Sequence, residues 1–265
     1  TAPTDAESRL AWLNKQSALH AGLASDGKEF KPQPWRQLQK VLHEMGHVED
    51  ARQVAISLED RLREANLIGQ TPKSWCIPRA WFYRKTSCGF HRLFGWLIGY
   101  GYRPLGLFFK MLVVWLVCGI FYWYAALNGV FAPSNPLVFQ NSEYAVCIPD
   151  SKAAKAELDK SACAVPPPVI GAGNWYLCEK LPEEYTGFSP LAYSLDLILP
   201  LVDLQQERDW APMILTPKNT WNGELFALSL KHFTRLMLWF EILFGWVASL
   251  LLVAVVSGLT KRREE

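Results

Sequence analysis

Two long apolar segments constrain this chain more than any other feature of its sequence. Leu105–Leu127 contains one charged residue, Lys110, near its start, and Leu236–Thr260 contains only Glu241. At about 1.5 Å per residue, a helix over either segment covers the roughly 30 Å hydrocarbon core of a bilayer. Neither segment has a polar face, which disfavours the alternative of two buried helices in a water-soluble core. The sequence therefore predicts a mainly α membrane protein with two transmembrane helices.

The charges beside these segments predict their orientation. Basic residues precede the first segment and follow the second, whereas residues 128–231 carry more acidic than basic residues. Because Lys and Arg gather on the cytosolic side, both termini are expected in the cytosol. The expected parts are a cytosolic helical module (1–80), an amphipathic interfacial helix (81–104), a first span (105–127), an extracytosolic loop (128–187), a short apolar helix (188–215), a long helix with the second span (221–260) and a cytosolic tail (261–265). For 81–104, a helix packed on the cytosolic module is the alternative.

The cytosolic module carries two stripes of apolar residues at helical spacing. One lies in Trp35–Met45 and the other in Val48–Leu62, with Gly46 between them. This pattern predicts an αα-hairpin, similar to one tetratricopeptide unit, and no second copy follows at the expected period. Asp5 is expected to begin a further short helix over 5–19. A single hairpin buries little, so we expect it to pack on the rest of the module or on a cytosolic protein partner.

Three cysteines lie in the expected extracytosolic loop: Cys147, Cys163 and Cys178. In an oxidising compartment a disulfide is reasonable, and three cysteines allow one bridge. The sequence does not choose the pair. Cys147–Cys163 is slightly preferred, because it would enclose a predicted soluble helix at Ser151–Lys160.

The most unusual segment is Phe188–Leu204, which is apolar but too short to cross a bilayer. It either dips into the membrane under cover of other protein or packs outside as a helix or oligomer contact. Glu241 is costly in lipid and needs a protein partner or a water-filled pore. Asp196 and Asp203 are seven residues apart and could share a helical face. The candidate pore-lining residues are Asp196, Asp203, Gln205, Gln206 and Glu241.

One motif points to different chemistry. His43-Glu44-Met45-Gly46-His47 fits H-E-x-x-H, in which two His on one helix bind zinc and the Glu is the general base. The alternative catalytic residue is therefore Glu44, with His43, His47 and Glu64 as metal ligands. Against this, Gly46 lies where the hairpin turn is predicted. No Gly-rich phosphate loop or CxxC pair is present, and a net charge of +2 leaves no nucleic-acid footprint.

Four stretches carry a resemblance to a known family: Pro32–Arg63 (PQPWRQLQKVLHEMGHVEDARQVAISLEDRLR), Gly99–Pro104 (GYGYRP), Tyr193–Trp210 (YSLDLILPLVDLQQERDW) and Glu241–Trp246 (EILFGW). They resemble blocks of uncharacterised bacterial two-span membrane proteins, which implies the bacterial inner membrane. Some of these are labelled membrane-associated oxidoreductases, although no cofactor motif is present here. The order of span, outer loop, short apolar helix and span also resembles two-helix pore-loop cation channels, without their TVGYG-type filter.

Three functions remain open from the sequence. The first is an oligomeric, cation-preferring membrane pore with a cytosolic regulatory module and no cofactor. The second is a membrane-tethered zinc metallopeptidase, and the third is a non-catalytic membrane anchor or sensor. A non-enzymatic role is favoured, with the lipid bilayer and further copies of the chain as partners and no nucleic acid.

Overall fold

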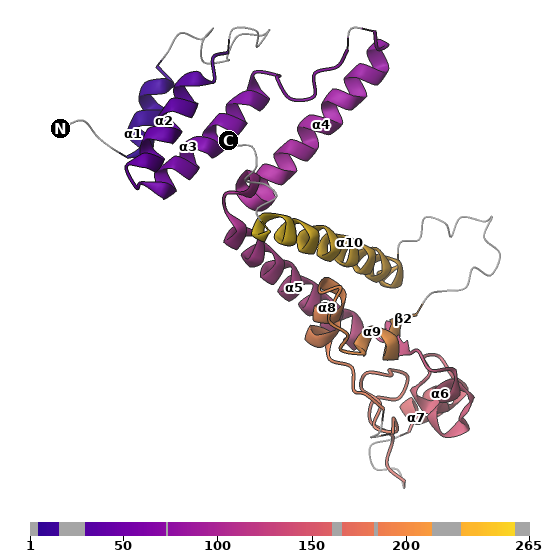
Figure 1. The fold of residues 1–265 in the computed structure, drawn as a ribbon. Coiled ribbons are helices and arrows are strands. Elements are labelled where there is room, and N and C mark those ends of the chain that lie inside the picture. The colour runs from indigo at the N-terminus through magenta and orange to yellow at the C-terminus, as the bar shows by residue number, and fades with distance from the viewer. Residues whose placement is uncertain are drawn as a thin grey trace. The chain divides into compact units, whose positions relative to one another are not determined.

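A computed structural model describes residues 5–15, 30–72, 74–160, 166–182, 185–213 and 229–257 of the chain. The fold is mainly α, as predicted, and includes two long apolar helices, α5 (Pro104–Leu127) and α10 (Leu230–Val256) (Figure 1). The chain divides into two compact units, Thr1–Phe108 with Ala254–Glu265, and Phe109–Val253. Cys163 and the expected tail, 261–265, lie outside the described residues.

The predicted hairpin is present in the first unit as α2 (Gln33–Glu44) and α3 (Val48–Glu64). Gly46 ends α2 with a φ of +83°, which a residue with a side chain adopts less readily. The Gly46 N–H donates to the His43 carbonyl (3.0 Å), and the next N–H, of His47, donates to the Leu42 carbonyl (2.9 Å). This is the Schellman arrangement, and it turns the chain sharply into α3.

A small apolar core holds the hairpin to the short helix α1 (Ala6–Leu13), which begins at Asp5 as predicted. The Asp5 carboxylate accepts the Ser8 N–H (2.9 Å), an N-cap contact that lowers the Asp5 pKa. The Ala6 N–H donates to Asp50 of α3 (3.3 Å). The buried core residues include Ala6, Trp35, Leu42, Ala51, Val54 and Leu58.

The segment expected as one interfacial helix, 81–104, is divided in the structure. A helix, α4, runs from Ile77 to Ile98 and is followed by a 3-10 turn, η1 (Gly99–Gly101), before α5 starts. Gly99 and Gly101 both have positive φ, at 55° and 95°. These two glycines end α4 and redirect the chain into the first long helix.

Both long helices leave most of their apolar surface uncovered by protein. In their most apolar windows, only 28% of α5 and 17% of α10 are buried. The second helix starts later than predicted, at Leu230 instead of Trp221. Ser229 precedes it without helical conformation, and its hydroxyl contacts the side-chain nitrogen Nδ1 of His232 (2.8 Å). Residues 221–228 lie outside the described part.

A two-stranded antiparallel sheet that the sequence did not predict follows α5. Strands β1 (Phe131–Pro133) and β2 (Trp210–Pro212) pair Phe131 with Pro212 and Pro133 with Trp210. The rings of Phe131, Phe188, Tyr193 and Trp210 pack beside it, with Phe131 and Phe188 stacked at 4.4 Å. This aromatic cluster fixes the end of α5 to the segment before α8.

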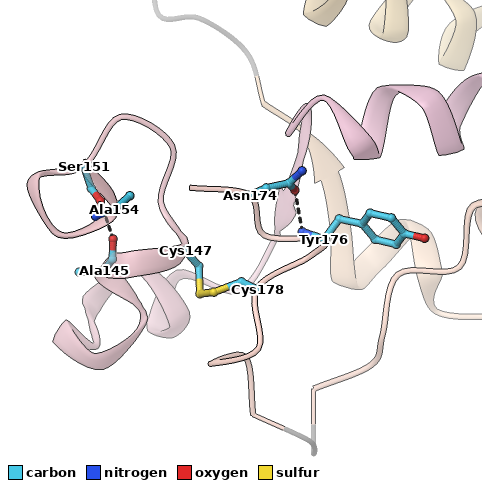
Figure 2. The surroundings of a disulfide bond; sticks show 7 residues. All are labelled: Ala145, Cys147, Ser151, Ala154, Asn174, Tyr176 and Cys178. Carbon is cyan, nitrogen blue, oxygen red and sulfur yellow. Dashed lines mark hydrogen bonds between the residues drawn. A yellow bond between two sulfur atoms is a disulfide. The ribbon is translucent and has the colours of Figure 1, made fainter. Parts of the chain in front are cut away.

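The disulfide joins Cys147 to Cys178, not to the slightly preferred Cys163 (Figure 2). The Gly173 N–H donates to the Val146 carbonyl (2.9 Å), and this backbone contact places the chain around 171–178 beside Cys147. The predicted soluble helix is present as α7 (Lys152–Leu158), capped by Ser151. The same region contains α6 (Pro136–Gln140) and a 3-10 helix, η2 (Ser142–Cys147).

Candidate functional site: the α8 hairpin

The unusual apolar segment forms a helix and a returning limb, which together we call the α8 hairpin (Phe188–Trp210). It contains α8 (Pro190–Ile198), a limb without regular structure (199–205) and the short helix α9 (Gln206–Asp209). Ser189 caps α8 and Pro190 occupies its first position. The hairpin belongs to the same unit as residues 109–253, which include most of both long helices.

Glycines on the two long helices let α8 approach them closely. On α5, a Cβ added at Gly119 would lie 2.7 Å from Leu191 Cδ2, and Trp115 Nε1 donates to the Leu191 carbonyl (2.9 Å). On α10, a Cβ added at Gly245 would lie 2.4 Å from the Ile198 carbonyl oxygen. Small residues permit such backbone approach between helices. α8 is therefore packed against both long helices.

A buried polar junction joins the same three helices. The Glu241 side chain of α10 is fully buried, and its Oε2 accepts the Tyr122 hydroxyl of α5 (2.7 Å). The Ser194 hydroxyl of α8 lies within hydrogen-bonding distance of both Glu241 Oε1 and the Trp115 carbonyl oxygen (2.9 Å), and its single hydrogen is shared between these two acceptors. The buried thiol of Cys118 lies beside this carboxylate. Glu241, predicted to line a pore, thus has its carboxylate satisfied by the chain's own hydroxyls.

Two more of the predicted pore residues hold the hairpin closed. The Asp196 carboxylate is buried and accepts the N–H groups of Leu204 (2.7 Å) and Glu207 (3.0 Å). Gln206 is also buried; its amide accepts the Ser189 N–H (2.9 Å) and donates to the Gly187 carbonyl (3.3 Å). These contacts join the two ends of the hairpin and satisfy the backbone of its returning limb.

The remaining two predicted residues, Asp203 and Gln205, are exposed on the returning limb. Gln205 has a φ of +61°, and its N–H donates to Asp203 Oδ1 (2.9 Å), which fixes this turn. Partial burial, together with the negative charges of Asp196 and Asp203, raises the pKa of Glu207.

A cavity of about 340 Å³ opens beside these carboxyl groups. We call it the acidic cavity; it is lined by Asp196, Asp203, Glu207 and Arg208 and by apolar residues that include Pro200, Ile242 and Trp246. Three acidic residues and one Arg thus line one open volume. The arrangement can attract cations, because like charges close together favour a positive counter-charge.

The returning limb also exposes apolar side chains. Leu201 is 91% exposed, and Val202 and Leu204 are exposed to a lesser degree. In water such an exposed run would be unfavourable, at about 25 cal/mol for each Å² of apolar surface. Lipid or another protein surface would remove that cost.

The residues of the zinc alternative are not brought together. α2 ends at Glu44, so His43 and His47 lie on opposite sides of the Gly46 turn and not on one helix. His47 instead faces Asp50 (3.8 Å), and Glu64 is at the far end of α3, bound to Arg61 (2.9 Å). Among the described residues, no group of three His, Cys, Asp or Glu side chains is placed to hold a metal.

Sequence reasoning missed Tyr122, Ser194, Gly119 and Gly245. A signal existed for the glycines, since an isolated Gly inside an apolar helix is typical of close helix packing. For Glu241, the sequence indicated only that a carboxyl group in lipid needs a protein partner, and not that Tyr122 and Ser194 are the partners. Comparisons with protein-family models, with curated proteins and with solved structures found no match.

Proposed function

We propose that the chain is an integral membrane protein whose α8 hairpin enters the bilayer from the outer side and forms the wall of a cation-preferring pore in a homo-oligomer. The main support for this proposal is where α8 contacts the long helices, measured along each helix from the end that would face outward, which is the C-terminal end of α5 and the N-terminal end of α10. Gly119 lies eight residues before the end of α5, about 12 Å along its axis. Gly245 lies 15 residues after the start of α10, about 22 Å along a helix of roughly 40 Å.

If α5 and α10 cross the bilayer, a helix at that depth lies inside the hydrocarbon core. Backbone groups there must be satisfied by protein. Ser189 caps α8, and Asp196 and Gln206 satisfy N–H groups of the chain on either side of it. These contacts fit a re-entrant segment better than a helix that rests in water above the membrane.

The returning limb supports an oligomer. It exposes the apolar side chain of Leu201 close in sequence to the charged side chain of Asp203. Water is unfavourable for Leu201, and lipid is unfavourable for Asp203. In a ring of copies, apolar side chains would contact the neighbouring chain and Asp203 would face a central water-filled path. Rings of carboxylates give pores a preference for cations. The order of span, loop, short helix, returning limb and span resembles that of two-helix pore-loop channels.

Two further observations favour an outer location for the hairpin. The disulfide Cys147–Cys178 lies in the same unit and forms readily in an oxidising compartment. Basic residues, among them Arg84, Arg92 and Arg103, precede α5 in the chain, which favours a cytosolic location for that side by the positive-inside rule.

Ion flux through the purified protein in lipid vesicles tests the proposal. Asp203→Asn should reduce cation flux roughly fivefold, the effect of about 1 kcal/mol of lost attraction per charge. Asp150→Asn, at an exposed carboxylate outside the hairpin, is the matched control and should leave flux unchanged. A protein that is monomeric in detergent, or whose vesicles show no flux above protein-free ones, would contradict the pore and favour an anchor or sensor.

A further inference from the structure

Helix α4 has two faces of opposite character. One face carries polar groups that contact α3 of the α2–α3 hairpin and the residues just after it. Arg84 Nη2 donates to Asn66 Oδ1 (2.9 Å), and His91 Nε2 lies 3.2 Å from Glu59 Oε2. The Cys88 thiol donates to the Ile68 carbonyl on the same face (3.8 Å). This side of α4 is therefore occupied by the chain itself.

The other face is aromatic and exposed. Phe82 is 64% exposed, Phe90 72% and Leu93 47%, and their spacings of eight and three residues place them on one side of the helix. At 100° per residue this side lies opposite the row formed by residues 84, 88 and 91. Lys85 and Arg92, exposed and seven residues apart, flank it along one edge. We call this side, formed by the aromatic Phe82 and Phe90 and the aliphatic Leu93, the aromatic face.

We propose that the aromatic face of α4 lies in the interfacial layer of the inner leaflet and that Lys85 and Arg92 bind anionic phospholipid headgroups. Exposed apolar residues opposite a polar face are typical of helices that lie in a membrane surface, and nearby Lys and Arg add attraction to anionic lipid. The inference rests on the proposed membrane location of α5 and α10, but not on the pore.

The short connection between α4 and α5 favours a bilayer as the partner of the aromatic face. α4 ends at Ile98 and the first long helix begins at Pro104, so at most about 20 Å of chain separates them. If α5 enters the bilayer, the end of α4 cannot be far from its surface. At that distance, lipid headgroups are the nearest partner for the exposed Phe90 (72%) and for the basic edge of α4.

The two faces of α4 then have separate roles. The polar face binds the hairpin through Asn66 and Glu59, while the aromatic face binds lipid. The helical module would thus be held beside the inner leaflet by contacts on a single helix, without inserting any of its own residues.

Nitroxide labels on the full-length protein in anionic lipid vesicles test this inference. The labels replace Phe90, Gln53 and Val117 one at a time, in a background without the four cysteines outside the disulfide, which are Cys76, Cys88, Cys118 and Cys163. Gln53 is an exposed control on α3, and Val117 is an exposed position on α5. Relaxation by oxygen reports lipid, and relaxation by a water-soluble nickel chelate reports water. We expect oxygen access and nickel protection at 90, and the reverse at 53.

Each outcome supports or overturns the inference. Replacing Lys85 and Arg92 with Gln should raise nickel access at position 90 in anionic vesicles and leave it unchanged in neutral vesicles. Each removed charge should weaken the association of α4 with the anionic surface roughly fivefold. Equal nickel access at 90 and 53 overturns the inference, and so does protection at 90 from both reagents, which would show a protein contact. If 117 is in lipid but 90 is not, only the α4 inference fails; if 117 is in water, the proposed membrane location fails with it.

Discussion

The hairpin of the first unit and the long helices of the second unit place polar and apolar groups in opposite ways. Around α2 and α3, apolar residues such as Trp35 and Val54 are fully buried, and ion pairs such as Lys40–Glu44 lie on the surface. Around α8, the polar side chains of Glu241 and Ser194 are fully buried, while apolar residues of the long helices are exposed. The exposed ones include Ile120, Leu243, Leu250 and Val253.

Under the proposed membrane location of the second unit, this difference indicates which forces hold each unit together. In water, burial of apolar surface is the main driving force, and exposed ion pairs add little. Where lipid is the solvent, apolar burial between helices gains nothing, so hydrogen bonds and close packing must supply the stability. The second unit has both, at Glu241 and at its two glycines. Substitutions of comparable kind in the two units should therefore have very different effects.

The largest effect should come from Glu241→Ala. It leaves the Tyr122 hydroxyl without an acceptor and removes buried volume, which should lower the free energy of unfolding by about 4 kcal/mol. Denaturant titration in detergent measures it. Glu241→Gln keeps the shape and an acceptor oxygen, and should cost less than about 1 kcal/mol.

Glu44→Ala provides the comparison in the first unit. Glu44 pairs with Lys40 at 3.8 Å, but its side chain is 62% exposed, so less than about 0.5 kcal/mol should be lost. Equal losses for Glu241→Ala and Glu44→Ala would show that the buried junction contributes nothing special, and the contrast between the units would not hold.

The next largest effect concerns the disulfide. Replacing Cys147 and Cys178 with Ser should lower the free energy of unfolding of the second unit by about 3 kcal/mol, since the bridge closes a loop over a sequence separation of 31. Reducing agent should act on the native protein in the same way and have no effect on the variant. Peptide mapping of the oxidised protein that found Cys147 joined to Cys163 would contradict the structure.

The sequence predicted the regular helices because their signals are local. The period of apolar residues located α2 and α3, Asp5 marked the start of α1, and Gly46 marked the turn. Length and composition were sufficient for α5. The start of α10 was placed too early, at Trp221, because the segment from there to the second span contains no Pro. Ser229, just before the helix, is not helical.

The candidate site was less predictable because its contacts join distant residues. Tyr122 and Glu241 are 119 residues apart, and Ser194 and Glu241 are 47 apart, so no local spacing connects them. Strands β1 and β2 are three residues each, too short for an alternating pattern. The disulfide pair depended on the Gly173–Val146 backbone contact, which only the folded chain shows.

Gly245→Ala tests close packing and should have an intermediate effect. Its Cβ would lie 2.4 Å from the Ile198 carbonyl oxygen, a backbone atom, so α8 must move away from α10. Such overpacking lowers the free energy of unfolding by about 2 kcal/mol. Gly89→Ala on α4 is the matched control, since nothing lies within 4 Å of its added Cβ, and it should stabilise by up to about 1 kcal/mol. If both variants changed the free energy of unfolding in the same direction, close packing of α8 on α10 would be contradicted.

Apart from the comparison and control variants, the smallest effect should come from Tyr100, a partly buried polar residue of the first unit. Its hydroxyl accepts from Arg63 (2.6 Å) and donates to Asp60 (2.8 Å), so Tyr100→Phe should cost about 1 kcal/mol at neutral pH. Burial and the hydrogen bond to Asp60 raise the Tyr100 pKa from 10.0 to about 12. The folded state therefore retains this proton at a pH where the unfolded chain loses it.

The stabilisation from Tyr100 should thus be complete below pH 10 and lost as the pH rises through 12. The difference in unfolding free energy between native protein and Tyr100→Phe, followed across this range, should shrink with rising pH. Other tyrosines and lysines titrate in both proteins and cancel in the difference. A difference that stays constant up to about pH 12 would show that Tyr100 is as solvated as a surface residue, and that the first unit has no polar junction comparable to that at Glu241.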